Sequence, residues 1–425
     1  MQRRNWRMYS GLLFAVVGLA QTPRPQRALT WQETQERFRA NNPTLLAGQE
    51  TIDESRVDEI TAFLRPNPDF TLTADGTQIT PSHGSWRPFA GTLYIPAISY
   101  LHERQHKREL RLESAQKATD IAVSAQADLE RTLMFNLRDA FVRVLQAKAV
   151  LEVARENLDY YDKEIGINRD RFKVGAIAQV DFQRVELQRV QFESDLATAQ
   201  VNVRTAKIDL LNLLRDRTPV DEFDVNEKFD FHEPLVSLEE LRAMALRTRP
   251  DLKEAEQSLD KARTDYRLAV ANGSTDPTFG LWWTHNGSFN NPDAFNTVGA
   301  SVSIPLRIFD RNQGNKAHTL IDIDRNKKLR DAAEQTTLHD VDSAYATLQS
   351  TLEILRPYKA KYLEEAASIR STVSFAYQHG AASLLDFLDA QKEYRDTELN
   401  YLNLVGSYLS AANQLNTSVG AEVIR

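Results

Sequence analysis

One stretch of the sequence has the spacing of a metal-dependent peptidase. His102-Glu103-Arg104-Gln105-His106 matches H-E-x-x-H, in which two histidines one helical turn apart bind zinc and the glutamate is the general base. The sequence offers no third ligand, and the stretch lies in a charged run beside an expected strand end. A glycine-rich phosphate loop and a G-x-S-x-G nucleophile motif are both absent from the sequence. We therefore expect no catalytic residue, no metal and no cofactor.

The composition restricts the class of protein. The chain has 425 residues, no cysteine, and a net charge of −7 from 52 basic and 59 acidic residues. The lack of cysteine excludes disulfides, thiolate metal sites and an N-terminal lipid anchor. The acidic balance argues against a nucleic-acid partner. A mean hydropathy of −0.47 argues against membrane-spanning helices, and 16 glycines with 15 prolines indicate few, long elements.

The N-terminus is typical of an export signal. Three arginines precede an apolar run, Ser10 to Leu19, and small residues at Gly18 and Ala20 fit cleavage after Ala20. The alternative, a short membrane anchor, conflicts with the length of the run, because ten helical residues cannot cross about 30 Å of hydrocarbon. We expect residues 1–20 to be a signal peptide, which implies the periplasm, the outer membrane or secretion.

The rest of the chain is a tandem repeat. Capping boxes begin at Thr30 and Ser237, with Glu33 and Glu240 three residues later. Further motifs recur in the same order at an offset of about 207 residues. The sequence predicts a first repeat over 21–215, a linker over 216–235 and a second repeat over 236–425. The other recurring pairs are Pro68-Asp-Phe70 with Pro277-Thr-Phe279, Ile95-Pro96 with Ile304-Pro305, and Phe172-Lys-Val-Gly175-Ala176 with Tyr377-Gln-His-Gly380-Ala381.

Each repeat is expected to contain two strands and a helical hairpin. After helices at about 44–65 and 251–271, the patterns predict strands over 69–79, 89–100, 277–287 and 296–307. Long runs with an apolar residue alternately every three and four positions, such as Leu137, Ala140, Val144 and Ala147, predict left-handed supercoiled helices. The run from about 98 to 173 would extend ~110 Å. Each run reverses at Gly175 or Gly380, and Pro357 predicts a kink, or a tolerated local bend, in the second hairpin.

The strands indicate a membrane oligomer. In the second predicted strand of each repeat, apolar residues occupy alternate positions and therefore share one face of the strand. Three tryptophans lie near strand ends or loops, as in an interfacial aromatic belt. Hydrocarbon cannot satisfy an open sheet edge, so a lipid-facing sheet must close. The four strands of one chain cannot close a barrel. Eight strands from two chains give a barrel whose interior is filled by side chains, whereas twelve strands from three chains leave a passage. The residues concerned are Phe89, Leu93, Ile95, Val298, Ala300, Val302 and Ile304, with Trp86, Trp282 and Trp283.

In these motifs and in their duplication, the sequence resembles the TolC family of outer-membrane efflux ducts over nearly the whole mature chain. The resemblance implies a mainly α protein with membrane β structure, a homotrimer with a 12-stranded barrel in the outer membrane and a long α-helical barrel in the periplasm. It also implies no enzymatic activity. The implied partners are outer-membrane lipid, a periplasmic adaptor at the helical tips, and an inner-membrane pump of the RND or ABC type.

The resemblance also assigns residues. It places Asp386 and Asp389 at the periplasmic aperture, where six carboxylates from three chains would favour cations; alternatively, they form a solvated helix face. Tyr377 and Asp181 match the family's closing latch, but the arginine position of that latch is Ala382. Arg184 is the substitute that we consider. The residues expected at the adaptor-contacting tips are Val174, Gly175, Ala176, His379, Gly380 and Ala381.

Two other functions remain open at this stage. A type I secretion duct for proteins or peptides would share the fold, because the duct supplies passage while the pump selects the cargo. A periplasmic adaptor or structural coiled coil would explain the signal and the heptads. It would not explain four strands at matched places in two repeats.

Overall fold

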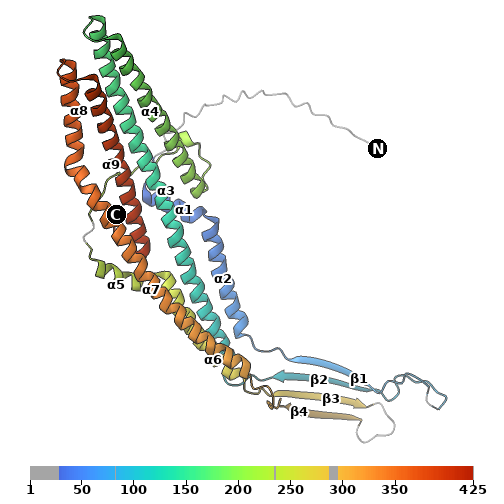
Figure 1. Ribbon diagram of the computed structural model, residues 1–425. Helices are drawn as coiled ribbons and strands as arrows, with labels where there is room; N and C mark the ends of the chain where they lie inside the picture. The colour runs from blue at the N-terminus through green and yellow to red at the C-terminus, as the bar shows by residue number, and fades with distance from the viewer. Residues whose placement is uncertain (1–27, 82, 234–235, 287–294, 425) are drawn as a thin grey trace, which may run out of the picture.

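The computed structural model describes residues 28–81, 83–233, 236–286 and 295–424. The expected signal peptide, residues 1–20, lies outside these ranges. The described part is elongated, with a long helical bundle and a four-stranded sheet at one end (Figure 1). Within the described ranges, no helix combines the length and apolar composition needed to cross a membrane.

Matching elements follow one another in the same order in both halves of the chain. The capping boxes of Thr30 with Glu33 and of Ser237 with Glu240 both form, as predicted. The first half contains α1 (Trp31–Asn41), α2 (Pro43–Phe63), β1 (Asp69–Asp75), β2 (Leu93–Leu101), α3 (Lys107–Lys173) and α4 (Gln179–Leu214), followed by the short turn η1 (Val220–Glu222). The second half contains α5 (Leu238–Thr248), α6 (Pro250–Asn272), β3 (Thr278–Asn286), β4 (Asn296–Ser303), α7 (Gln313–Pro357), η3 (Tyr358–Tyr362), α8 (Leu363–Gln378) and α9 (Leu384–Val419).

Several element boundaries differ from the predicted ones. Strand β1 ends at Asp75 rather than near 79, because Gly76 adopts a φ of +76° that an extended strand cannot contain. Helix α3 begins at Lys107 rather than near 98, since β2 continues to Leu101 and is followed by a turn with positive φ at Gln105 and His106. The 67 residues of α3 correspond to a length of about 100 Å.

The four strands form one antiparallel sheet in the order β1-β2-β3-β4. Strand β2 therefore pairs with β3, which lies in the other half of the chain. Strands β1 and β4 are the two edges of this sheet. Each leaves a row of backbone donors and acceptors without a strand partner among the described residues.

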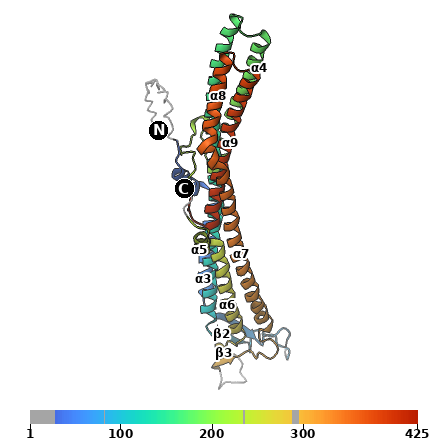
Figure 2. The same ribbon diagram turned by 60° about the vertical axis from the view of Figure 1, so that its left-hand side comes forward.

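The helices form a curved wall with a different order at each end. Near the sheet the order is α2-α3-α6-α7, and toward the tips it is α4-α3-α9-α8. Figures 1 and 2 show both hairpins running side by side away from the sheet. The predicted heptad seams are buried, since Leu137, Val144, Tyr161, Phe387 and Leu415 are all less than 1% exposed. Long-range packing along these seams thus fixes the wall.

Pro357 ends α7 and is followed by a π-helical turn, Tyr358–Tyr362. A proline lacks the N–H that an α-helix needs, and a wider turn accommodates this loss. The helix axis changes direction between α7 and α8 (Figure 1). The first hairpin has no such break, since α3 is a single helix. The predicted kink is therefore confirmed as a difference between the two halves.

Candidate functional site

One face of the sheet is apolar and exposed in the single chain. Phe70, Ile98, Leu281 and Ala300 lie opposite one another across the four strands, so their side chains share one face. Phe70 is 69% exposed, Ile98 55% and Leu281 58%. An exposed apolar patch of this extent marks an interaction surface. The same face also carries Leu72, Tyr94, Pro96, Tyr100, Phe279, Trp283, Val298 and Val302.

The opposite face carries mostly Thr, Ser, Asp and Gly. Asp69, Ser99, Gly280 and Ser301 form one cross-strand row on it. In the next row the Trp282 ring covers Gly299, where a Cβ atom would lie only 2.3 Å from ring carbons. The sheet therefore separates an apolar side from a polar side.

The alternate residues that were predicted to face lipid lie on the apolar face in β4 but on the polar face in β2. Leu93 and Ile95 lie opposite Asp75 and Thr73 of β1, and therefore on the polar face. Because side chains alternate along a strand, choosing the wrong parity assigns every residue to the wrong face. Phe89 precedes β2 and Ile304 follows β4, so neither residue is in a strand.

The predicted tryptophan belt is also partly wrong. Trp282 and Trp283 lie inside β3 rather than at its end. Trp86 does lie in the segment between β1 and β2, where its indole N–H donates to the backbone oxygen of Gln78.

The outermost helices carry exposed apolar stripes. On α4, Leu187, Val190 and Val201 are between 55% and 72% exposed, and their spacing places them on one face of the helix. Ile60 of α2 is 65% exposed and Ile321 of α7 is 68% exposed. These three helices lie at the edges of the wall described above. A coiled-coil seam without a partner requires another helix.

The two hairpin tips share one turn geometry. Gly175 and Gly380 have φ values of +76° and +74°, the left-handed conformation that favours glycine at a helix end. The backbone N–H of Ala176 donates to Arg171 O (2.8 Å), and that of Ala381 donates to Ala376 O (2.8 Å). A Cβ atom at either glycine would meet no other atom within 4 Å. The tips lie farthest from the sheet (Figure 1).

The remaining tip residues are exposed. Val174 is 79% exposed, and Ala176 and Ala381 are exposed as well. The His379 imidazole packs on Phe375, with 4.1 Å between ring centroids. Val174, Ala176 and Ala381 are thus exposed at the tips, while His379 packs on the preceding turn of its own helix.

Tyr377 is buried just inside the second tip. Its ring stacks on Phe387, with 4.8 Å between centroids, and the Arg171 guanidinium lies 4.8 Å from the ring centroid. Burial raises the pKa of Tyr377, Asp181 and Glu164 raise this pKa further, and Arg171 opposes the rise. The Tyr377 hydroxyl is buried and has no hydrogen-bond partner among the described residues.

Arg171, rather than Arg184, is therefore the arginine beside Tyr377. Arg184 lies on the exposed surface of α4. The sequence contained one signal for Arg171, its position four residues before the tip glycine Gly175. Only the pairing of α3 with the second hairpin brings it to Tyr377, which lies 206 positions further along the chain.

Other polar contacts between the hairpins were not predicted from the sequence. The Gln378 amide donates to the Glu164 carboxylate at 3.1 Å, and the Tyr160 hydroxyl donates to Ser374 Oγ at 3.2 Å. The Arg370 guanidinium lies between two rings, 4.2 Å from the Tyr160 centroid and 3.4 Å from that of Tyr394. These contacts attach α8 and α9 to α3 below the tips.

Asp386 has a structural role in addition to its charge. It is the third residue of α9 and completes a capping box with Ser383, whose backbone N–H and hydroxyl donate to the Asp386 carboxylate at 3.0 and 2.7 Å. These hydrogen bonds lower the pKa of Asp386, so the carboxylate stays ionised at neutral pH. Asp389 lies one turn further along α9 and is exposed.

We expect Asp386→Ala and Ser383→Ala to loosen the first turn of α9, because each removes half of the capping box. A carboxyl with a lowered folded-state pKa contributes its stabilisation above its unfolded pKa and loses it as the pH falls through the folded value. The protection factors of the Asp386 and Phe387 amides, which donate to Ser383, should therefore fall in both variants at pH 7, and in the wild type only at strongly acidic pH. Asp389→Ala is the control. If it loosened the turn equally, the capping role would be wrong.

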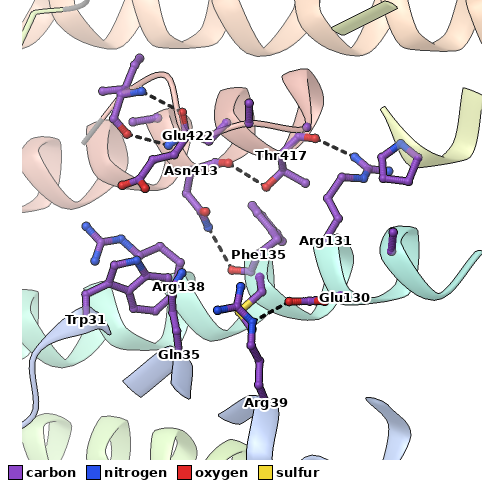
Figure 3. Close-up of a pocket in the computed structure, with 18 of the residues that line it drawn as sticks. Trp31, Gln35, Arg39, Glu130, Arg131, Phe135, Arg138, Asn413, Thr417 and Glu422 are labelled. Atoms are coloured by element: carbon purple, nitrogen blue, oxygen red, sulfur yellow. Dashed lines mark hydrogen bonds and ion pairs between the residues drawn. The ribbon is translucent and has the colours of Figure 1, made fainter. Parts of the chain in front are cut away.

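A cavity of about 330 Å³ lies halfway along the wall, between α1, α3 and α9 (Figure 3). Several of its polar groups are paired within the chain. The Arg39 guanidinium pairs with Glu130 at 2.6 Å, and the Asn413 amide donates to the backbone oxygen of Phe135 at 3.0 Å. The Arg138 guanidinium lies 4.7 Å from the Trp31 ring centroid. This arrangement fastens the C-terminal end of α9 to the first half of the chain.

The H-E-x-x-H stretch does not have the geometry of a zinc site. It forms a turn rather than a helix, with positive φ at Gln105 and His106. Glu103 is held by Arg111, with Nη2 2.9 Å from Oε2, and the His102 ring packs against Phe279. Across the described ranges, no group of three potential metal ligands occurs.

Comparison with known proteins decides the family. The model of the outer membrane efflux protein family matches residues 35–214 and 241–421, one match in each half of the chain. The chain belongs to the outer membrane efflux protein family. It is thus a channel protein of the outer membrane with a periplasmic helical extension, and the alternative of a periplasmic adaptor or structural coiled coil is not supported.

Individual relatives agree with this assignment. The chain is 23% identical to the cobalt-zinc-cadmium resistance protein CzcC of Cupriavidus metallidurans, over 89% of this chain and 87% of the relative. It is also 23% identical to the outer membrane protein TolC of Vibrio cholerae, over 91% and 90% of the two chains. The crystal structure of CusC has the same fold, with a TM-score of 0.75, 18% identity and 92% of each chain covered.

Proposed function

We propose that three copies of this efflux channel form one continuous duct, with twelve strands in the outer membrane and twelve helix segments around a periplasmic passage. The apolar row of Phe70, Ile98, Leu281 and Ala300 carries this proposal, because such a row on an exposed sheet face suits contact with lipid. Hydrocarbon cannot satisfy the open edges of β1 and β4. In the ring, β1 of each copy pairs with β4 of the next.

The number of copies follows from the interior of the barrel. Eight strands enclose a space that side chains fill, whereas larger barrels leave an aqueous channel. Twelve strands from three chains give the smallest closed barrel of this sheet with a passage. The exposed stripes of α2, α4 and α7 lie on the same two outer sides as the strand edges, where a neighbouring copy would cover them. The polar sheet face would then line the water-filled lumen.

The tips are proposed to dock a periplasmic adaptor, which couples the duct to an inner-membrane pump of the RND or ABC type. The exposure of the residues at both tips supports this surface. They comprise Val174, Gly175, Ala176, His379, Gly380 and Ala381. The pump supplies energy and selection, and the duct supplies passage.

The second tip is proposed to close the duct at rest. In three copies, Asp386 and Asp389 would place six carboxylates around the periplasmic mouth, which favours cations. Tyr377 and Asp181 would form the closing latch. Arg171 would supply the arginine beside the tyrosine, whereas in the family the latch arginine lies at the position that Ala382 occupies here. The exposed Arg184 would then contact a neighbouring copy or solvent rather than Tyr377.

The cargo is proposed to be small toxic solutes, with metal cations as the first class to test. CzcC is named for cobalt, zinc and cadmium resistance, and CusC of Escherichia coli is named as a cation efflux protein. Deletion of the gene, followed by exposure to metal salts, dyes and drugs, tests this class. Loss of a secreted protein with unchanged tolerance to all solutes would instead indicate a type I secretion duct.

Conductance in planar bilayers tests the duct itself. The purified full chain should migrate as a trimer on an unheated denaturing gel and open cation-selective pores. Asp389→Asn should reduce cation selectivity without changing the trimer, because it removes three carboxylates from the mouth and leaves the capping box of α9 intact. Asp58→Asn, the same isosteric change at an exposed position of α2 far from the mouth, is the control. An elongated soluble monomer would refute the duct, and unchanged selectivity would refute the aperture role of Asp389.

A further inference from the structure

A small basic cavity lies where the first pair of strands meets the helices. Its volume is about 200 Å³, and its wall includes Arg65, Tyr100, His102, Lys107 and Arg108. Arg65 belongs to the linker between α2 and β1, while Lys107 and Arg108 begin α3. The cavity thus lies within one chain, at the foot of the sheet, where the α2–β1 linker, the end of β2 and the start of α3 meet.

The charges around this cavity leave a positive excess. Glu103 is paired with Arg111, Glu109 with Arg108 at 2.9 Å, and Lys107 with Asp276. Arg65 is exposed, and the described residues give it no ion-pair partner. The Arg108 Nε atom is buried and has no hydrogen-bond partner in the described structure. The site therefore has one unpaired cation, Arg65, beside the paired guanidinium of Arg108, which suits a singly charged anion such as a phosphodiester.

The apolar face of the sheet begins directly beside the cavity. Tyr100 lies opposite Phe279 on that face, and the His102 ring packs against Phe279 with 6.4 Å between centroids. On the other side, the Arg108 guanidinium lies 4.4 Å from the Phe63 ring centroid, and Phe63 is 46% exposed. A free phosphate ion would use only the cavity. A lipid would use the cavity and this apolar surface together.

We propose that this cavity binds the phosphodiester of a glycerophospholipid in the periplasmic leaflet of the outer membrane. The phosphate lies between Arg65 and Arg108, and the acyl chains follow the apolar face past Tyr100 and Ile98. An anionic headgroup such as phosphatidylglycerol is favoured, because it adds no cation beside Arg65. Bound lipid would set the depth of the barrel in the membrane. This inference depends on the proposed placement of the sheet in lipid.

Native mass spectrometry of the purified full-length protein tests the site, with phosphatidylglycerol and phosphatidylcholine as probes. The wild type should retain phosphatidylglycerol more strongly than phosphatidylcholine. Arg65→Gln/Arg108→Gln should bind phosphatidylglycerol roughly thirtyfold more weakly, because each of the two basic residues contributes separately to binding of an anionic lipid. Arg65→Lys/Arg108→Lys keeps both charges and should retain most of the binding.

The matched control is Arg56→Gln/Arg263→Gln, which removes two arginines that are about 60% exposed on α2 and α6. It should bind lipid as the wild type does. Equal binding by the Arg65/Arg108 variant and this control would overturn the site. Full displacement of lipid by inorganic phosphate at equal concentration would also overturn it, since the apolar surface would then contribute nothing. Trimer migration and conductance report separately on the duct, so loss of lipid with both intact concerns this site alone.

Discussion

Arginine in place of Ile98 is expected to prevent assembly in the outer membrane, whereas arginine in place of Ser99 is expected to be tolerated. The two residues are neighbours in β2, but Ile98 lies on the apolar face between Phe70 and Leu281, and Ser99 lies on the polar face between Asp69 and Gly280. An arginine that faces hydrocarbon near the middle of the membrane costs about 2–4 kcal/mol in a transmembrane barrel. Three copies would contribute this cost three times in one trimer.

The measurement is the amount of protein in the outer-membrane fraction and its trimer band on an unheated gel. Ile98→Arg should be lost from both, and Ser99→Arg should match the wild type. In the latter, Asp69 lies directly across from the new arginine and can pair with it, which supports tolerance. If both variants assembled equally well, the apolar face would not contact lipid. If Ser99→Arg alone failed, the two faces would be assigned the wrong way round.

Tryptophan in place of Gly380 is expected to abolish export while leaving the trimer intact. The tip is a helix end with φ of +74° at Gly380, and a Cβ atom there would meet no other atom within 4 Å. The chain can therefore accommodate a side chain sterically, at a backbone cost of roughly 1–2 kcal/mol for the left-handed conformation. A large ring at this exposed position would obstruct an adaptor. Solute tolerance should fall to that of a strain without the gene.

Asparagine in place of Gly380 separates docking from folding. Asparagine accepts the left-handed conformation more readily than most residues and adds little bulk, so this variant should keep most of the export activity. Assembly of both variants is followed by the unheated trimer band, and docking by cross-linking to the adaptor. Normal export by Gly380→Trp would exclude the tip from the docking surface. Loss of the trimer in both variants would show that the glycine serves only the helix end.

Local patterns in the sequence predicted the elements well. The capping boxes at Thr30 and Ser237, the tip turns at Gly175 and Gly380, and the break after Pro357 all occur where they were expected. Each depends on residues within a few positions of one another, so the sequence contains the full interaction. The seven-residue period of the long runs is similarly local, and it correctly identified the buried seams.

The site was harder to predict because its contacts join distant segments. The face of β2 depends on its register with β1 and β3, and the apolar residues Leu93 and Ile95 pointed to the wrong side. Arg171 reaches Tyr377 only because α3 packs beside the second hairpin. The basic cavity at the foot of the sheet combines Arg65 with Arg108 through the pairing of β1 with β2. Nothing in the spacing of these residues reveals their proximity.

By itself, the sequence determined the duplication, the long heptad helices and their reversals, and through its resemblance the family of outer-membrane efflux proteins. These properties follow from short-range periodicity and from recurring motifs. The tertiary structure alone decided which sheet face is apolar, which arginine lies against Tyr377, and that Asp386 is engaged at the start of α9 by Ser383. The physical reason is that strand register and helix-to-helix packing select one arrangement among several that the same local patterns permit.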